Sequence, residues 1–226
     1  MLNKIIQGDC LDILPKIAFE FSNKYIIVTD PPFNIGYNYN SYADNLGADE
    51  YYEMLQQVFG DNPSVVIHYP EELYKIAFQI GHFPEKVVSW VYNSNTPRQH
   101  RDIAFFNIKP DFSKCGQPYK NPEDKRIRER IANGEQSRLY DWWEVQQVKN
   151  VSDDKTEHPC QMPLEVMKRI IAILPADYII VDPFAGSGTT GVACKQLKRD
   201  FILIEQDNKY VELASTRISS QPQPMF

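Results

Sequence analysis

The sequence lacks long apolar runs and closely paired cysteines, and each absence narrows the class of protein. No apolar stretch approaches the ~20 residues of a membrane-spanning helix, and the first residues contain no apolar signal segment. The four cysteines form no C-x-x-C pair, which favours reduced thiols over a disulfide framework or a zinc site. We therefore expect a cytoplasmic protein without membrane contact, whose 226 residues form one domain with or without a small embedded unit.

The sequence also lacks an overall excess of basic charge, but its charge is unevenly distributed. Between Arg98 and Lys149 there are eleven Lys/Arg and eight Asp/Glu, a balance of +3 in a chain of net charge −6, so the remainder carries −9. A positive segment on an acidic body suits a protein that meets phosphates through one region only. A solvated, charge-rich subdomain would give the same pattern.

Two apolar runs each end in an acidic residue followed by proline. Tyr25–Val28 precedes Asp30-Pro31-Pro32-Phe33, and Tyr178–Val181 precedes Asp182-Pro183-Phe184-Ala185-Gly186-Ser187-Gly188. Each run is typical of a buried parallel strand that stops at a turn. Because ligands bind at the carboxyl ends of strands in a doubly wound sheet, we expect adjacent pockets for a nucleotide-like cofactor and for a second planar group. This pairing indicates group transfer to a base.

Apolar segments of strand and helix type alternate along most of the chain. The alternation predicts an α/β fold with a doubly wound, mostly parallel sheet and helices on both faces. Residues 109–156 break the pattern with proline, glycine, aromatic and basic residues, and we interpret them as an insert outside the sheet, with 1–108 and 157–226 forming the main domain. The predicted strands are 4–7, 24–29, 64–68, 86–92, 102–108, 178–182 and 201–204, and the predicted helices are 11–19, 49–59, 71–80, 164–174, 189–197 and 209–218. If 123–133 is also helical, Lys125 and Arg128 share one face of it and Arg126 and Arg130 another.

The segment Gly186–Gly191 matches G-x-G-x-x-G between a strand and a helix, a pattern whose usual interpretation is dinucleotide binding. Glu205 ends the next strand, where a carboxylate can accept hydrogen bonds from ribose hydroxyls, so a ribose-bearing cofactor is expected. Only 38 residues follow Gly188 in this sequence, too few for the second half of a dinucleotide domain. We therefore disfavour a nicotinamide oxidoreductase and expect the upstream strands to complete the sheet, with the reaction half first and the cofactor half C-terminal.

The order of these motifs resembles the permuted class-β DNA amino-methyltransferases. The resemblance rests on Asp30–Phe33, on His158-Pro159-x-Gln161-x-Pro163 and on Asp182–Thr190, and it covers about residues 3–108 and 157–218. It implies a circularly permuted, Rossmann-like methyltransferase sheet, S-adenosylmethionine as cofactor and double-stranded DNA as substrate. It also implies that 109–156 is a target-recognition region and that the protein is DNA-associated in a prokaryote or virus. A homodimer and a cognate restriction endonuclease stay open.

The resemblance also implies roles for individual residues. Asp30 and the Pro31 carbonyl would accept hydrogen bonds from an exocyclic amine and so localise its lone pair, and Phe33 would stack on a flipped-out base. The implied catalytic residues are Asp30, Pro31, Pro32 and Phe33. The implied cofactor-binding residues are Asp9 (alternatively a simple helix cap), Cys10, Asp182, Phe184, Gly186, Ser187, Gly188, Thr189, Thr190 and Glu205. The candidate DNA-binding residues are Arg98, Arg101, Lys125, Arg126, Arg128 and Arg130.

The sequence departs from the family pattern at three positions. Cys160 and Met162 stand where Thr and Lys are usual, which implies weaker binding of the cofactor carboxylate, and Phe33 replaces the commoner Tyr. Aspartate before Pro-Pro favours adenine N6 over cytosine N4, since the cytosine enzymes more often carry Ser there. An RNA acceptor and a catalytically silent DNA-binding module stay open. For His68, His82, His100 and His158 we expect surface or helix-entry positions rather than acid–base catalysis.

Overall fold

The computed structural model of the chain describes residues 1–37, 44–149, 155–158 and 160–221. Within these ranges no helix is both long enough and apolar enough to cross a membrane. The strands are β1 (Lys4–Gln7), β2 (Tyr25–Thr29), β3 (Ser64–His68), β4 (Lys86–Val91), β5 (His100–Phe106), β6 (Gly116–Gln117), β7 (Ser137–Arg138), β8 (Trp142–Glu144), β9 (Ile179–Asp182) and β10 (Phe201–Glu205). The helices are α1 (Cys10–Glu20), α2 (Ala48–Phe59), α3 (Pro70–Ile80), the 3-10 turn η1 (Phe112–Lys114), α4 (Lys125–Ala132), α5 (Leu164–Ala172), α6 (Thr189–Gln196) and α7 (Asn208–Ser219).

The main sheet has the strand order β1-β10-β9-β2-β3-β5-β4-β8. All neighbouring strands are parallel except β5, which is antiparallel to both β3 and β4. The predicted mostly parallel α/β sheet is therefore confirmed. β2 lies directly beside β9, with Ile27 opposite Val181, so the turns that follow these two strands are neighbours although about 150 residues separate them in the chain.

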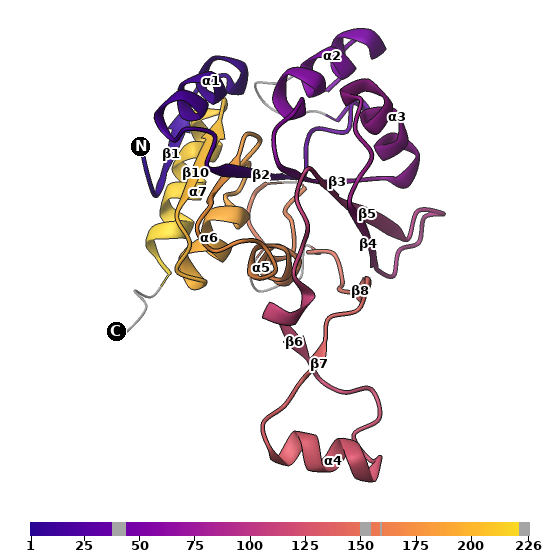
Figure 1. Cartoon of the computed structure of the whole chain (residues 1–226). Helices are drawn as coiled ribbons and strands as arrows, with labels where there is room; N and C mark the ends of the chain where they lie inside the picture. The colour runs from indigo at the N-terminus through magenta and orange to yellow at the C-terminus, as the bar shows by residue number, and fades with distance from the viewer. Residues whose placement is uncertain (38–43, 150–154, 159, 222–226) are drawn as a thin grey trace.

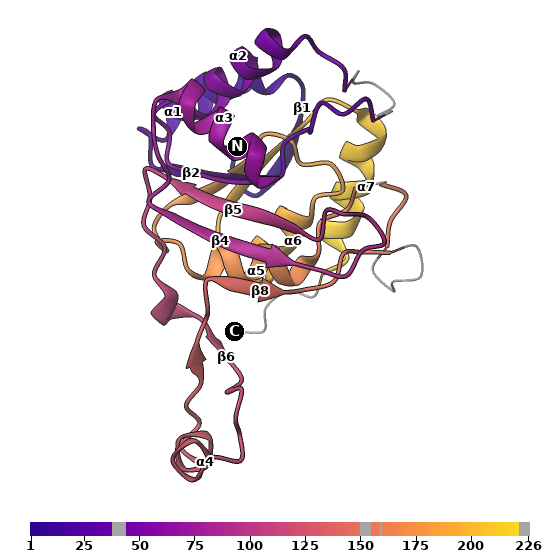
Figure 2. The same cartoon turned by 90° about the vertical axis from the view of Figure 1, so that its right-hand side faces the viewer.

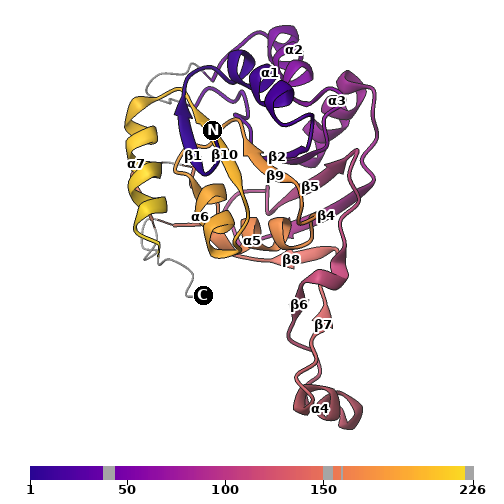
Figure 3. The same ribbon diagram turned by 60° about the vertical axis from the view of Figure 1, so that its left-hand side comes forward.

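Helices cover both faces of the sheet (Figure 1). α1, α2 and α3 pack on one face, where they bury residues such as Ile17, Leu55 and Ile76. α5 and α6 pack on the other face, with Val166 and Ile170 in its core, and α7 lies at the same side of the molecule beside β1 (Figure 3). The strands are apolar on both sides because both faces are covered, which explains why β2 and β3 are buried along their whole length.

The interpretation of 109–156 as lying wholly outside the sheet is wrong at its C-terminal end. Trp142–Glu144 forms β8, which pairs with β4 in the main sheet, and the Trp143 side chain is buried. The apolar signal of this short strand was hidden among polar neighbours. The preceding residues form an arm that projects from the body, made of the β6–β7 pair and α4 (Figures 1 and 2). Within the stretch 123–133, for which a helix was one alternative, the structure has α4, which is capped by the Asp124 side chain and has no buried residue.

Strand polarity fixes where this arm leaves the sheet. Along β5, Asp102 pairs with His68 at the end of β3, whereas Phe106 pairs with Ser64 at its start. The chain therefore enters the arm at the end of the sheet where the parallel strands have their N-termini. β8, which runs parallel to β4, begins at that same end. The turn after β2 lies at the opposite end of the strands. The arm with α4 projects away from the body of the molecule (Figure 2).

Two glycines with nearly the same left-handed backbone test how closely α6 packs against α7. Gly188 (φ +75°) would place a Cβ only 2.7 Å from the Cβ of Ala214, whereas Gly134 (φ +76°) in the arm has open space around it. We expect Gly188→Ala to lower the free energy of unfolding by about 2–4 kcal/mol through backbone strain and overpacking together. Gly134→Ala, which carries the backbone cost alone, is expected to lose only about 1 kcal/mol. Urea denaturation followed by circular dichroism measures both, and equal losses would contradict a tight α6–α7 contact.

Candidate functional site

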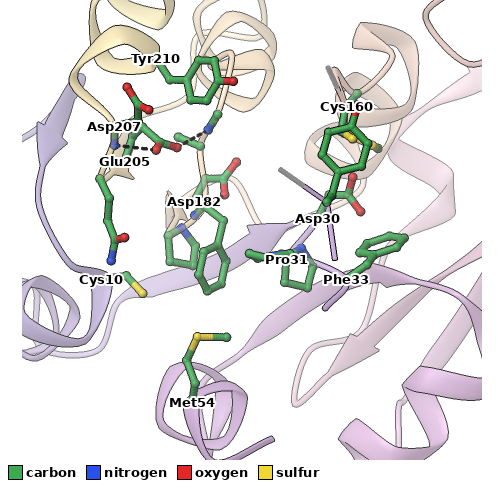
Figure 4. Close-up of a pocket in the computed structure, with 18 of the residues that line it drawn as sticks. Cys10, Asp30, Pro31, Phe33, Met54, Cys160, Asp182, Glu205, Asp207 and Tyr210 are labelled. Atoms are coloured by element: carbon green, nitrogen blue, oxygen red, sulfur yellow. Dashed lines mark hydrogen bonds between the residues drawn. The ribbon is translucent and has the colours of Figure 1, made fainter. Parts of the chain in front are cut away.

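A cavity of about 610 Å³ opens at the carboxyl ends of the central strands. Four acidic residues that line it come from four strand ends: Asp9 after β1, Asp30 after β2, Asp182 at the end of β9 and Glu205 at the end of β10. Figure 4 shows Asp30, Pro31 and Phe33 on one side of the cavity, Glu205, Asp207 and Tyr210 on the other, and Asp182 between them. The two predicted turns therefore share one cavity, with a volume in the range of small-molecule sites.

The cavity brings together most of the residues that the sequence singled out. Its wall includes all four residues of Asp30–Phe33 and nine of the ten candidate cofactor residues; Gly188 alone of the ten is not on the wall. Of the six candidate DNA-binding cations, only Arg101 is there. The nine wall residues are Asp9, Cys10, Asp182, Phe184, Gly186, Ser187, Thr189, Thr190 and Glu205.

Asp182 fastens the two turns to each other. Its Oδ1 accepts hydrogen bonds from Thr29 Oγ1 at the end of β2 (2.7 Å) and from the Phe184 backbone N–H (3.1 Å). Its Oδ2 accepts one from Thr190 Oγ1 on α6 (2.5 Å). Burial raises the pKa of Asp182 to about 6, although these hydrogen bonds act in the opposite direction. Both carboxylate oxygens are thus engaged in holding the cavity floor together, and the Thr190 hydroxyl is committed to Asp182.

Glu205 holds the glycine turn from the neighbouring strand. Its Oε2 accepts a hydrogen bond from the Gly186 N–H (2.8 Å) and its Oε1 accepts one from the Asp207 N–H (2.9 Å) (Figure 4). Gly186 has φ +49°, and a Cβ there would lie 2.7 Å from His158 Nε2, so only glycine fits between the turn and that ring. Burial raises the pKa of Glu205, and these backbone hydrogen bonds act to lower it.

The start of α6 is also held from α7. Arg217 Nη1 donates to the Ser187 carbonyl (2.9 Å), to Ser187 Oγ (3.1 Å) and to Thr189 Oγ1 (3.0 Å). This places a guanidinium beside a helix N-terminus, where it adds to the positive end of the helix dipole. No local sequence pattern points to Arg217, because it lies 29 residues beyond Gly188 in an ordinary amphipathic helix, α7.

On the other side of the cavity, Asp30 forms an ion pair with Arg101 from β5, with 3.1 Å between Arg101 Nη1 and Asp30 Oδ2. The expectation that Arg101 faces DNA phosphates is corrected: its side chain is only 14% exposed and lies in the cavity wall. Burial raises the pKa of Asp30 to about 6, and Arg101 acts to lower it. No sequence pattern indicates this pair, because its members are 71 positions apart.

His68 supports the Pro-Pro turn and is buried, so its expected surface position is wrong, whereas the expected helix-entry position is confirmed, because it directly precedes Tyr69, the N-cap of α3. The Tyr69 N–H donates to His68 Nδ1 (2.8 Å), so the ring proton is on Nε2, and that atom lies 3.2 Å from Tyr51 Oη. Tyr51 Oη in turn donates to the Pro32 carbonyl (2.7 Å). The ring of His68 also stacks on Phe33, with centroids 4.0 Å apart and planes inclined by 19°. One face of Phe33 is therefore covered by His68, and the Arg101 guanidinium also lies over the ring, with its Cζ 4.7 Å from the ring centroid.

His158 is likewise buried rather than at the surface, against Gly186 and edge-on to Tyr210 (4.6 Å between ring centroids). Burial lowers the pKa of His68 to about 3 and that of His158 to about 4, so both rings are neutral at pH 7. His82, in contrast, is paired with the exposed carboxylate of Asp61 (2.7 Å), in keeping with a surface position.

The other candidate DNA-binding cations do not reach the cavity. Arg98 pairs with Glu71 (3.0 Å) and lies over the Tyr69 ring (4.2 Å), close to the cavity rim. The four cations of α4 lie on the projecting arm (Figure 2). This arm leaves the sheet at the end of the strands opposite Asp30. These four are Lys125, Arg126, Arg128 and Arg130.

The chain was compared with known protein families and with characterised proteins. A family model for DNA methylases of the N6/N4 type matches residues 25–216. The chain belongs to this DNA methylase family. The Type II methyltransferase M.HpaI of Haemophilus parainfluenzae is 29% identical over 216 residues, which are 87% of this chain and 68% of that protein. The DNA adenine methyltransferase YhdJ of Escherichia coli is 25% identical over 250 residues, 95% of this chain and 82% of that protein.

Solved structures of DNA methyltransferases share the fold. The M1.HpyAVI complex with SAM aligns with a TM-score of 0.62 at 22% identity, covering 95% of this chain and 98% of that one. The PvuII cytosine-N4-specific DNA methyltransferase aligns with a TM-score of 0.66 at 17% identity, covering 98% and 87%. The Rossmann-like methyltransferase sheet predicted from the sequence is thereby confirmed.

The two buried histidines give a direct test of the cavity interior. We expect the imidazole ¹⁵N resonances of His68 and His158 to stay constant between pH 5.5 and 8, because both rings are neutral throughout that range. Long-range ¹H–¹⁵N spectra, with His68→Gln and His158→Gln to assign the signals, measure this.

The same burial makes the free energy of unfolding depend on pH. Because these rings take up a proton near pH 6.5 only in the unfolded chain, their contribution to the free energy of unfolding is complete above about pH 6.5 and is lost as the pH falls below it. A titration midpoint near 6.5 for either ring would contradict its burial.

Proposed function

We propose that the protein transfers a methyl group from S-adenosylmethionine to the N6 amine of an adenine that is flipped out of double-stranded DNA. The observation that carries this proposal is the shared cavity. The buried Asp30 carboxylate lies on one side of it, and the glycine turn, hydrogen-bonded to Glu205 through Gly186, lies on the other. A donor held at the glycine turn and a base held at Asp30 would meet within this cavity, and such positioning supplies much of the catalysis in group transfer.

The donor side fits a nucleoside with a charged amino-acid tail. Glu205 would accept hydrogen bonds from the ribose hydroxyls, and Asp9, which also caps α1 through a 2.8 Å hydrogen bond from the Leu11 N–H, would contact the adenine; both residues line the cavity. The N-terminus of α6, reinforced by Arg217, provides positive potential for the donor carboxylate. This last feature offers a physical substitute for the Lys that Met162 replaces.

The acceptor side fits an exocyclic amine. Asp30 Oδ1 is buried without a hydrogen-bond partner among the described residues, and a carboxylate oxygen in that state is an acceptor for an amine N–H. Phe33 and Tyr69, whose rings meet edge to face at 5.0 Å, give the base an aromatic wall. Hydrogen bonds from the amine to Asp30 and to the Pro31 carbonyl would localise the nitrogen lone pair.

When bound, S-adenosylmethionine supplies an electrophilic methyl group whose C–S electron pair returns to sulfur as the new N–C bond forms. Asp30 holds the amine in line for this attack. The methylated nitrogen then carries one proton too many, and Asp30, already hydrogen-bonded to it, accepts that proton and passes it to solvent.

Cytosine N4 is the second candidate acceptor, because the chain shares its fold with a cytosine-N4-specific enzyme. Aspartate before Pro-Pro and the adenine-methylating relative YhdJ favour adenine. Incubation with labelled donor and duplex DNA, followed by digestion to nucleosides, separates the two, and N4-methylcytosine alone would overturn the adenine assignment. An RNA control in the same assay tests the remaining acceptor. Several relatives are named Type II methyltransferases, which supports a partner restriction endonuclease for this protein. Whether the protein is a homodimer is tested by analytical ultracentrifugation.

Replacing the acidic residue of the Pro-Pro turn separates chemistry from binding. We expect Asp30→Asn to lower the rate of methyl transfer by about 10²- to 10³-fold, because the variant loses the charged acceptor for the amine. Donor affinity, measured by calorimetry, is expected to stay within about threefold, since the donor residues lie across the cavity. Asp61→Asn, which changes an exposed carboxylate, is the control. DNA retention without any transfer by the unmodified protein would favour a catalytically silent DNA-binding module.

We further propose that the arm contacts DNA phosphates away from the target base. Lys125 and Arg128 share a face of α4. Replacing both by Ala is expected to weaken DNA binding and to reduce the slope of log K against log salt by about 2, if each cation neutralises one phosphate. The pair Lys16→Ala and Lys75→Ala, on the α1–α3 face, is the matched control. Fluorescence anisotropy at several salt concentrations measures both, and an unchanged slope for the arm variant would exclude this contact.

A further inference from the structure

The ion pair between Arg101 and Asp30 has an unusual environment. Both side chains are almost fully buried (14% and 13% exposed), and a single contact of 3.1 Å joins Arg101 Nη1 to Asp30 Oδ2. Asp30 Oδ1 and Arg101 Nε are each buried with no hydrogen-bond partner among the described residues. A buried ion pair adds little net stability when its remaining polar atoms are unsatisfied. The pair is therefore better explained by what it does for Asp30 than by stabilisation of the fold.

The surroundings hold the guanidinium in place. Arg101 Cζ lies 4.7 Å from the centroid of the Phe33 ring, 5.4 Å from that of Trp90 and 5.7 Å from that of Tyr69. Its backbone is fixed by the sheet, where Arg101 pairs directly with Trp90 of β4. Three aromatic rings around a planar cation limit its rotation and keep water away from it. The Asp30 carboxylate is consequently oriented by a rigid partner.

The electrostatics of Asp30 depend on this partner. The Asp30 pKa is raised to about 6: burial and the nearby Asp182 carboxylate raise it, and the charge and hydrogen bond of Arg101 lower it. Without that cation the pKa of Asp30 would rise further, and a protonated carboxyl is a poorer acceptor for an amine N–H. The other groups facing the pair are the neutral His68, the hydroxyls of Tyr69 and Tyr92, and the Cys160 thiol.

We propose that Arg101 is a positioning residue for methyl transfer: it keeps the buried Asp30 carboxylate charged and oriented, so that Oδ1 is free to accept the hydrogen bond of the base amine. This inference rests on the proposed function of the cavity. It assigns the buried cation of β5 to the reaction instead of to DNA phosphates, and it predicts that the acid limit of activity is set jointly by Asp30 and Arg101.

The pH dependence of activity tests this role. In Arg101→Met we expect the acid limb of kcat/KM to move up by about one to three pH units, because an opposite charge lowers a carboxyl pKa by that amount. Transfer at pH 7 should fall about tenfold and recover toward pH 9, where Asp30 ionises again. In Arg101→Lys, which keeps the charge, the midpoint of the acid limb should lie within a few tenths of a pH unit of its value in the unmodified protein. Donor binding by calorimetry checks that each variant is folded, and Arg101→Gln replaces the Met variant if that one does not fold.

A direct titration of Asp30 does not depend on turnover. In protein labelled with ¹³Cγ-aspartate and assigned with Asp30→Asn, the Asp30 midpoint should rise in Arg101→Met and stay unchanged in Arg98→Met, which removes a neighbouring cation that stacks on the same Tyr69 ring. If the unmodified protein transfers no methyl group to any DNA, the proposed function fails, and this titration still decides whether Arg101 keeps Asp30 charged.

Three results would overturn the proposal. An unchanged Asp30 midpoint in Arg101→Met would show that the ion pair does not control its charge. Loss of transfer with an unshifted acid limb and no recovery at pH 9 would mark Arg101 as merely structural. Faster transfer by Arg101→Met at pH 7 would show that the guanidinium, 4.7 Å from the Phe33 ring, blocks the site of the base instead of preparing it.

Discussion

The hydrogen bonds of the Asp182 carboxylate are the constraint on which the rest of the cavity depends. Through Thr29 they reach the strand that ends at Asp30, through Phe184 the glycine turn, and through Thr190 the start of α6. One buried carboxylate therefore fixes the distance between the two halves of the site. Because its oxygens are fully engaged, Asp182 organises the cavity and leaves ligand contacts to its neighbours, and burying it is tolerable only because three donors satisfy it.

The cavity distributes its charge in two pairs of opposite sign. Beside the Pro-Pro turn Asp30 is matched by Arg101, and beside the glycine turn the N-terminus of α6 is matched by Glu205 nearby and reinforced by Arg217. The histidines take no part in this balance, since burial keeps His68 and His158 neutral and leaves them a packing role under Phe33 and Gly186. This arrangement suits a reaction in which a positive sulfur loses its charge and no base is needed before attack.

Much of the fold could be predicted because it follows from local patterns. The apolar run before Asp30, the helical spacing of Leu11, Leu14, Ile17 and Ala18, and the Asp9 cap are read within a few residues, and each matches the structure. β8 could not be found this way, because three residues around Trp143 form a strand only when β4 is there to pair with them. Arg101 was misassigned for a related reason: a basic residue near a basic segment gives no local sign that a carboxylate 71 positions away will cover it.

The sequence by itself determined that two strands end in turns, one acidic and proline-rich and one glycine-rich, since these properties reside in the backbone preferences of consecutive residues. It also determined the family. Only the tertiary structure decided which side chains face each other across the cavity, and that Arg101 pairs with Asp30 and Arg217 donates to Ser187. It also decided that the arm with the basic helix leaves the sheet at the end of the strands opposite Asp30. Those relations are through-space contacts between distant segments, and they come into existence only when the strand order and polarity of the sheet are fixed.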